Sequence, residues 1–416
     1  MRRTLGLILT FAMLLLITTS SIARADSLVT TINLGNTGSQ GPPVFDPANG
    51  DIYVSNLGTL DQGTMSIISG ATNSVVANVT TGQSSRPSLP TLDPANGDVY
   101  IAEGTNTLAI ISGSSNEIVA SIPIGNHLET PAYDSTNGDL YLSSTLTNTV
   151  YVISGSSNNV VANVSVSGPG VPTFDPSNGD IYLSGNSGVT IISGSSNEDI
   201  ANLTIPGNSS SFGIDTSDNE VYVPVGDDVT VLSGSTNDVL ANITVSPDAQ
   251  TPVYDPVNGN VYVAESEVAA VAIISASTNK LIANVSVGID PYPPVIGSNG
   301  SVFVSNAGSN ADTGVGSNSV SVISGTSVVS TVQVCSGQYT YCHPETGAFD
   351  STNGDVYVPN ENFGTVSVIS PSSSHSSGSS FPLSYFAVTA AAVLVAAVAT
   401  VMALRARRAR APGPAP

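Results

Sequence analysis

One motif recurs eight times along the 416 residues of the chain. The hexapeptide DPANGD begins at Asp46, and related hexapeptides follow at steps of 40 to 54 residues. In order, the eight copies begin at Asp46, Asp93, Asp134, Asp175, Asp215, Asp255, Ile296 and Asp350. An aromatic residue stands seven positions after the start of every copy. A register kept in this way indicates a repeat architecture, which constrains the fold more than any local pattern does.

Each repeat contains four short segments rich in valine, isoleucine, threonine and tyrosine. In the fourth repeat the first segment is Pro172–Asp175 and the second is Asp180–Leu183; a V-x-[IV]-I-S run and a V-V-A-N-V run supply the other two in most repeats. The N-G and S-G-S-x-N connectors provide the residues with positive φ that tight hairpins need. A four-stranded antiparallel unit every ~40 residues is typical of a β-propeller blade.

The two ends of the repeat array complement one another. Leu28–Gly35 aligns without a gap on Leu281–Gly288 and is therefore a fourth segment without a repeat of its own, whereas the last repeat stops at Ser370 without a fourth segment. The N-terminal strand can complete the last blade, which closes the ring and removes an exposed edge. The sequence thus predicts an all-β, eight-bladed propeller over residues 26–370. A seven-bladed ring that absorbs the degenerate repeat at Ile296 is the alternative.

Both ends of the chain resemble targeting segments. Residues 1–25 have the basic start, apolar core and small-x-small cleavage site of a signal peptide. After a Ser-rich stalk at residues 371–384, residues 385–404 form an uncharged run that covers about 30 Å as a helix, enough to span a bilayer. The basic tail at 405–416 then stays in the cytoplasm by the positive-inside rule. We expect a single-pass protein of the cell membrane with an extracellular ectodomain.

The predicted ectodomain is strongly acidic. Between Asp26 and Ser380 the basic residues are Arg86 and Lys280, while all 31 acidic residues lie there. A nucleic-acid partner is excluded, because neutralising phosphates requires clustered lysine and arginine. The acidity suits an acidic habitat, in which carboxylates are partly protonated, and a salt-rich habitat is the alternative.

Three segments resemble a known repeat family. Asn279–Asn306 (NKLIANVSVGIDPYPPVIGSNGSVFVSN), Asn318–Ser324 (NSVSVIS) and Asp51–Asn56 (DIYVSN) are similar to the YVTN-family β-propeller repeat of archaeal surface-layer and cell-surface proteins. The turns depart from that family, with S-G-S in place of D-T-A and D-P-x-N-G-D in place of S-P-D-G-K. The resemblance implies an extracellular propeller for cell-surface architecture, adhesion or ligand binding, and it implies no particular chemistry.

The longest connections fall on one face of the predicted ring, opposite the tight turns. They are Ser55–Gly63, Ser305–Ser317, Cys335–Gly347 and Pro359–Gly364, in blades that become neighbours once the ring closes. We predict a binding sector there for a surface glycan, a neighbouring envelope protein or a cation; loop variation without a ligand is the alternative. Its candidate residues are Asp61, Asp312, Tyr339, Tyr341, Glu345 and Glu361.

Few residues carry recognisable chemistry. The pair Cys335 and Cys342 is expected to form a disulfide in an exported chain. His127, His343 and His375 fall in three different contexts, so their spacing predicts neither a metal site nor a catalytic triad. The recurring aspartates are interpreted as Asx-turn residues. No cofactor is expected, although a structural calcium ion at these oxygen-rich turns remains an alternative.

Seven Asn-x-Ser/Thr sequons follow the repeat. They are Asn78, Asn163, Asn202, Asn208, Asn242, Asn284 and Asn299. Five of them, all but Asn208 and Asn299, share one position in the fourth segment, which is the outermost strand of a blade. Glycans there would project from the rim, whereas a common Asn and Ser/Thr composition is the alternative explanation.

The function predicted from these features is that of a membrane-anchored cell-surface propeller for adhesion, envelope structure or ligand binding. Its partners would be envelope proteins or surface glycans. An extracellular enzyme of the lyase or lactonase type is the alternative, and a passive spacer is a third. The first segments, such as PPVFD and VPTFD, are apolar and nearly uniform. That uniformity favours binding over catalysis, because an active site needs one or two blades that differ at the central channel.

Overall fold

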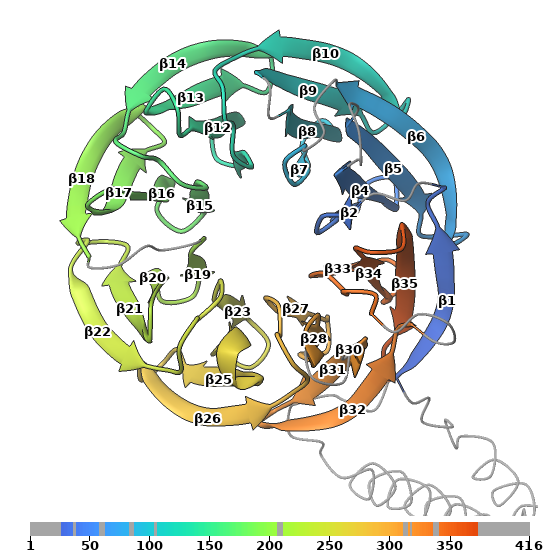
Figure 1. The fold of residues 1–416 in the computed structure, drawn as a ribbon. Helices are drawn as coiled ribbons and strands as arrows, with labels where there is room; N and C mark the ends of the chain where they lie inside the picture. The colour runs from blue at the N-terminus through green and yellow to red at the C-terminus, as the bar shows by residue number, and fades with distance from the viewer. Residues whose placement is uncertain are drawn as a thin grey trace, which may run out of the picture. The chain divides into compact units, whose positions relative to one another are not determined.

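Eight antiparallel sheets follow one another around a ring in the computed structural model of the chain (Figure 1). The structure describes residues 26–35, 39–57, 63–82, 87–103, 106–205, 211–310, 315–316, 318–335 and 341–372. The predicted signal peptide, membrane segment and tail lie outside these residues, as does the predicted stalk except for residues 371–372. None of the helical segments within the described ranges is long and apolar enough to cross a membrane.

The strands of the first four blades are listed here in chain order. Blade 1 contains β2 (Ser39–Gln40), β3 (Val44–Asp46), β4 (Asp51–Leu57), β5 (Gly63–Ser69) and β6 (Ser74–Gly82). Blade 2 contains β7 (Thr91–Asp93), β8 (Asp98–Glu103), β9 (Thr107–Ser112) and β10 (Glu117–Pro123). Blade 3 contains β11 (Ala132–Asp134), β12 (Asp139–Ser144), β13 (Thr149–Ser154) and β14 (Asn159–Ser165). Blade 4 contains β15 (Thr173–Asp175), β16 (Asp180–Gly185), β17 (Gly188–Ser193) and β18 (Glu198–Thr204).

The other four blades repeat this order. Blade 5 contains β19 (Gly213–Asp215), β20 (Glu220–Val225), β21 (Asp228–Ser233) and β22 (Val239–Thr244). Blade 6 contains β23 (Val253–Asp255), β24 (Asn260–Glu265), the 3₁₀ turn η1 (Ser266–Val268), β25 (Ala270–Ser275) and β26 (Lys280–Ser286). Blade 7 contains β27 (Val295–Ile296), β28 (Val302–Asn306), β31 (Ser319–Ser324) and β32 (Ser327–Gln333), with a ribbon of β29 (Ser309–Asn310) and β30 (Val315–Gly316). Blade 8 contains β33 (Ala348–Phe349), β34 (Val356–Asn360), β35 (Thr365–Ser370) and β1 (Ser27–Asn33).

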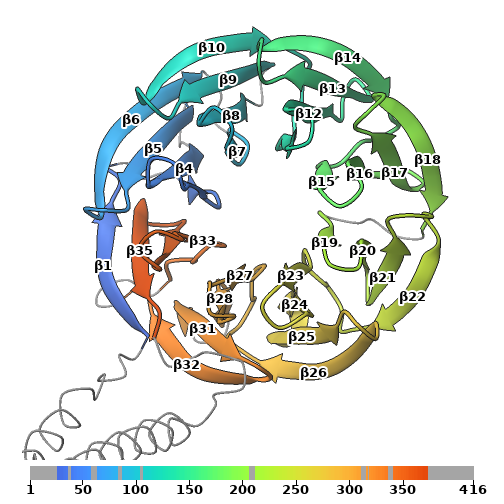
Figure 2. The same cartoon turned by 180° about the vertical axis from the view of Figure 1, so that it is seen from behind.

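The N-terminal strand closes the ring, as predicted. Strand β1 pairs antiparallel with β35, with Leu28 opposite Ile369 and Ile32 opposite Val366. Figures 1 and 2 show β1 on the rim between β32 and β6, where it occupies the outer place that the fourth strand fills in every other blade. The degenerate repeat at Ile296 forms a blade of its own, so the seven-bladed alternative is wrong.

The apolar core lies between the blades. Eight clusters of buried residues each combine side chains of two neighbouring blades, as where Ile32 and Leu34 pack with Ile52 of blade 1 and Tyr357 of blade 8. The recurring aromatic residue is fully or almost fully buried in all eight blades. Because apolar burial is the main favourable term in folding, each blade depends on its neighbours for stability.

Hydrogen bonds at the tight-turn end connect most blades to the next. The Tyr141 hydroxyl donates to Asn197 Oδ1 of the following blade at 2.5 Å, and Tyr357 does the same to Asn73 across the closure at 2.6 Å. The turn asparagine adds a second link, since Asn137 Nδ2 donates to the carbonyl of Gly194 at 2.9 Å. The spacing of Asn and Tyr in the repeat therefore reflects contacts between blades.

The recurring aspartate shapes the turn that carries these links. Asp46 Oδ1 accepts the backbone N–H of Ala48 at 2.8 Å, and the six other aspartates do the same with the second residue after them. This contact confirms the predicted Asx-turn role. In the next blade a glycine faces the aspartate; a Cβ at Gly70 would collide with Asp350 Oδ2. The aspartates thus have a structural role in every blade that carries one.

Candidate functional site

The connections of blades 7, 8 and 1 meet at the end of the ring opposite the tight turns. Ser39 Oγ, at the entry to blade 1, donates to Glu361 Oε1 of blade 8 at 2.6 Å. Ser305 Oγ of blade 7 donates to the carbonyl oxygen of Glu345 at 2.6 Å. These contacts confirm the prediction that connections of these three blades are neighbours.

The structure brings together half of the predicted binding residues. Tyr341, Glu345 and Glu361 gather around His343, whereas Asp61, Asp312 and Tyr339 lie outside the described residues. One connection was predicted wrongly: Pro359–Gly364 is not a long loop, because β34 ends at Asn360 and β35 begins at Thr365. The four residues between them form a turn like the one between β12 and β13 in blade 3.

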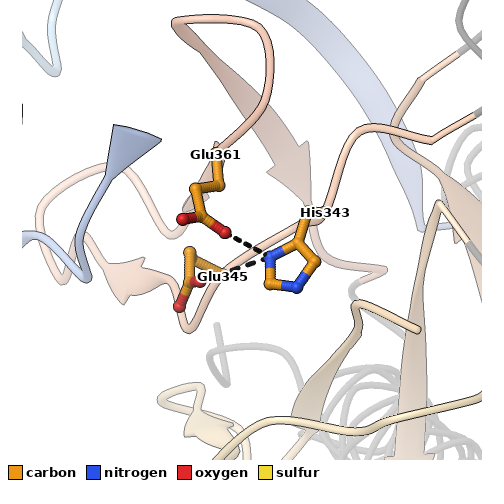
Figure 3. A group of neighbouring side chains, drawn as sticks. All are labelled: His343, Glu345 and Glu361. Atoms are coloured by element: carbon orange, nitrogen blue, oxygen red, sulfur yellow. Dashed lines mark ion pairs between the residues drawn. The ribbon is translucent and has the colours of Figure 1, made fainter. Parts of the chain in front are cut away.

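His343 occupies the centre of the group, and its Nδ1 faces both glutamates (Figure 3). The distance from Nδ1 is 2.6 Å to Glu361 Oε2 and 3.5 Å to Glu345 Oε1. Nδ1 is buried between the two carboxylates. The three side chains are 15 to 26% exposed, so the group is accessible from solvent and is not part of the core.

Backbone hydrogen bonds and a disulfide hold these three residues in place. Glu361 N–H donates to the carbonyl oxygen of His343 at 3.0 Å, and Glu345 N–H donates to that of Pro359 at 2.9 Å. The predicted disulfide between Cys335 and Cys342 is present and ends directly before His343. His343 itself has φ of 53°. The backbone around the site is thus cross-linked on both sides of the histidine.

Two tyrosines flank the histidine ring. The ring centroids of Tyr292 and Tyr341 lie 5.6 and 5.4 Å from that of His343, and both pairs are edge-to-face. Tyr292 enters from blade 7 and also hydrogen-bonds the Glu345 carboxylate. The two rings therefore form the walls of the site beside its carboxylates.

The protonation of the site follows from its burial and charge. Burial raises the pKa of Glu345, and the contact with His343 lowers it in part. The contact with Glu345 raises the pKa of His343, burial lowers it, and the negative charges of Glu361 and Asp290 raise it further. Burial also raises the pKa of Tyr292 and of Tyr341. The site therefore favours a positive charge at its centre.

His343 was absent from the residues predicted from sequence, although a signal existed. The pattern H-x-E occurs twice, at His127–Glu129 in blade 3 and at His343–Glu345 in blade 8, in the same connection between outer and inner strands. Both histidines have positive φ, 50° and 53°. What distinguishes the two is the residue four positions after the core tyrosine, which is Glu361 in blade 8 and Thr145 in blade 3. Only the alignment of the repeats shows that difference.

The sequons lie mostly on the rim. Five of them are exposed on outer strands: Asn78 (β6), Asn163 (β14), Asn202 (β18), Asn242 (β22) and Asn284 (β26). Asn299 is half-buried in the turn between β27 and β28, and Asn208 lies outside the described residues. On three of the five strands the asparagine Oδ1 accepts a hydroxyl from the neighbouring strand, as Asn78 does from Ser66 at 2.7 Å.

Comparison with models of known protein families finds no match to this chain. A search of curated proteins likewise finds no match. The fold is therefore established by the eight blades themselves, and the function has to be inferred from the site.

The site suits a cationic ligand. Two carboxylates and an imidazole converge on one point, and Lys280 on β26 is the only lysine or arginine among the described residues. A positively charged group or a metal ion can accept electron pairs from all three donors. The tyrosines add flat, partly apolar walls of the kind that recognise sugars and organic cations.

Proposed function

We propose that the chain is a membrane-anchored cell-surface propeller that binds a ligand through the connections of blades 7, 8 and 1. The observation that carries this proposal is the gathering of His343, Glu345, Glu361 and two tyrosines on one sector of a ring that is otherwise nearly uniform. A solvent-accessible charged group on a rigid scaffold is the usual form of a binding site, because connecting segments vary while the scaffold holds them.

The placement of the site supports a role at the cell surface. The connections that carry it leave the blades at the end opposite the tight turns, and β35, the last described strand, runs toward the tight-turn end. A tether that follows β35 would leave the binding sector facing away from the membrane. The exposed sequons on the rim are consistent with an exported and glycosylated body. Membership of the YVTN family is part of this proposal, on the repeat resemblance alone.

The test is cell-surface association of the full-length protein. We expect the double variant E345Q/E361Q to bind envelopes of the producing cell at least ten-fold more weakly than the original chain. The matched control is Glu129→Gln in blade 3, which removes a carboxylate at the position equivalent to Glu345. Equal envelope binding by the original chain and by the double variant would contradict the proposal.

A second measurement addresses the rim. We expect deglycosylation of the exported protein to lower its mass, and we expect peptide mapping to find sugar on the five outer-strand sequons. Sugar confined to Asn299, which is half-buried, would contradict the proposed arrangement.

A further inference from the structure

We propose that His343, Glu345 and Glu361 bind a divalent transition-metal ion, for which Zn²⁺ is the reference. Each residue offers one donor atom, and the three atoms all lie within 4.8 Å of one another. This inference names a ligand for the proposed binding sector. It rests on the proposed function only in that both use the same three side chains.

The donor distances are close to those of a coordination shell. Donors about 2.0–2.1 Å from a tetrahedral zinc ion are roughly 3.3 Å apart. The 3.5 Å between His343 Nδ1 and Glu345 Oε1 already fits that separation. The 2.6 Å between Nδ1 and Glu361 Oε2 has to increase by about 0.7 Å, which a rotation of the glutamate side chain can supply.

The chemical nature of the donors selects the class of metal. One imidazole nitrogen and two carboxylate oxygens suit Zn²⁺ and its neighbours in the first transition row. Ca²⁺ requires six to eight oxygen donors and has no use for an imidazole. Three protein donors leave at least one coordination position for water or for a group on a partner, as in zinc sites that take up exchangeable ligands.

Neighbouring side chains orient the donors. Ser39 Oγ donates to Glu361 Oε1, which turns the other oxygen, Oε2, toward His343. Tyr292 hydrogen-bonds the carboxylate of Glu345. Partners of this kind fix ligand geometry and are a regular feature of metal sites. The disulfide and the two backbone hydrogen bonds described above order the segment in advance, which lowers the entropy lost on binding.

The competing explanation is that a protonated histidine simply bridges the two glutamates. Such a bridge would direct the Nδ1–H at a carboxylate oxygen, and the 2.6 Å between Nδ1 and Glu361 Oε2 is short enough for it. A metal ion uses the same nitrogen through its lone pair and neutralises both carboxylates at once. The two explanations differ in whether the protein takes up one metal ion per chain.

Blade 3 provides an internal control for the proposed site. His127 and Glu129 repeat the H-x-E pattern, and the backbone contacts are the same: Thr145 N–H donates to the carbonyl of His127 at 3.2 Å, as Glu361 N–H does to that of His343. The third donor is missing, because threonine stands where blade 8 has glutamate. The proposal therefore attributes metal binding to Glu361 and predicts none at blade 3.

The experiment is calorimetric titration of Zn²⁺ into the full-length protein, purified without a polyhistidine tag and freed of metal by a chelator. We expect one ion per chain, at least 100-fold weaker binding by His343→Ala and by Glu361→Thr, and unchanged binding by His127→Ala. Co²⁺ in place of Zn²⁺ should give the visible absorption of a nitrogen- and oxygen-coordinated ion, and Glu361→Thr should abolish it. Circular dichroism of each variant establishes that the propeller is folded.

Three results would overturn the proposal. They are absence of Zn²⁺ binding by the folded original chain, binding that survives both His343→Ala and Glu361→Thr, and Ca²⁺ binding of equal strength that does not depend on His343. Because the titration uses purified protein, its outcome is independent of envelope association. A protein that binds envelopes without binding Zn²⁺ would refute the metal site and leave the proposed function standing.

Discussion

Replacing Leu34 by alanine tests how much the closure of the ring contributes to stability. Leu34 follows β1 and is 2% exposed, in a cluster that joins blades 8 and 1. Removing a buried leucine side chain costs about 2–5 kcal/mol, since transfer free energy is lost and a cavity remains. Total stability is typically about 5–15 kcal/mol, so this one change should remove a large fraction of it.

The repeat supplies a control at the equivalent position of another blade. Ile124 follows β10 and is 6% exposed between blades 2 and 3, away from the closure. Ile124→Ala should cost a similar amount, about 2–5 kcal/mol. Val29 lies on the closing strand β1 and is 43% exposed. Val29→Ala should therefore change the free energy of unfolding by less than about 0.5 kcal/mol.

Urea unfolding followed by circular dichroism measures all three variants. The midpoint and slope of each transition give the free energy of unfolding by linear extrapolation. If Leu34→Ala unfolds within about 0.5 kcal/mol of the original chain while Ile124→Ala loses more than 2, β1 contributes nothing to the ring and our account of closure is refuted. A lower slope for Leu34→Ala alone would mean that blade 8 opens before the other blades.

Three further predictions concern the links between blades, the acidic turns and the disulfide. Tyr141→Phe removes the hydroxyl that bonds Asn197 and should lower the free energy of unfolding by about 1 kcal/mol in the same urea assay; no change would mean that the link is not stabilising. Burial raises the pKa of turn carboxyl groups in five blades, at Asp51, Asp98, Asp139, Asp175, Asp180 and Asp255. The native state binds these protons more tightly than the unfolded chain, so the groups stabilise the fold below about pH 4 and lose that effect as pH rises. The urea midpoint at pH 4.5 should therefore exceed that at pH 7.5, and the reverse order would contradict this. Replacing Cys335 and Cys342 by serine opens a loop of sequence separation 7. The unfolded chain gains entropy, so the free energy of unfolding should fall by roughly 2.5 kcal/mol. An unchanged urea midpoint would show that other contacts order the loop.

Most of the fold could be predicted because the determinants of a blade are local. The N-G turns, the buried tyrosine and the aliphatic runs recur within each repeat, and each fixes its own hairpin or strand. The closure was also predictable, since Leu28–Gly35 matches the fourth segment of other repeats. The asparagine and tyrosine links between blades were not, because a conserved register alone does not distinguish a turn residue from a contact to the next blade.

The site was predicted only in outline because its geometry depends on three separate segments. The length of the connections pointed to the sector, and three of the residues named within it, Tyr341, Glu345 and Glu361, lie together in the structure. That they bind a ligand stays a prediction. His343 was overlooked because its neighbour across the site, Glu361, lies 18 residues later, in a turn whose place beside it depends on the register of β34. Spacing in sequence carries no direct information about such a pair.

The two ends of the ring explain why blade 8 could acquire a site that blade 3 lacks. The links between blades involve the aspartate, asparagine and tyrosine at the tight-turn end, and blades 3 and 8 keep all three. Thr145 of blade 3 and Glu361 of blade 8 directly follow the second strand of their blades, at the opposite end of the ring. The backbone N–H of each donates to the carbonyl oxygen of the blade's histidine, whatever the side chain. An exchange of threonine for glutamate there leaves the contacts at the tight-turn end intact. A third donor can therefore be added or lost without affecting those links, and Thr145→Glu should give blade 3 a measurable affinity for Zn²⁺ if the proposed site is correct.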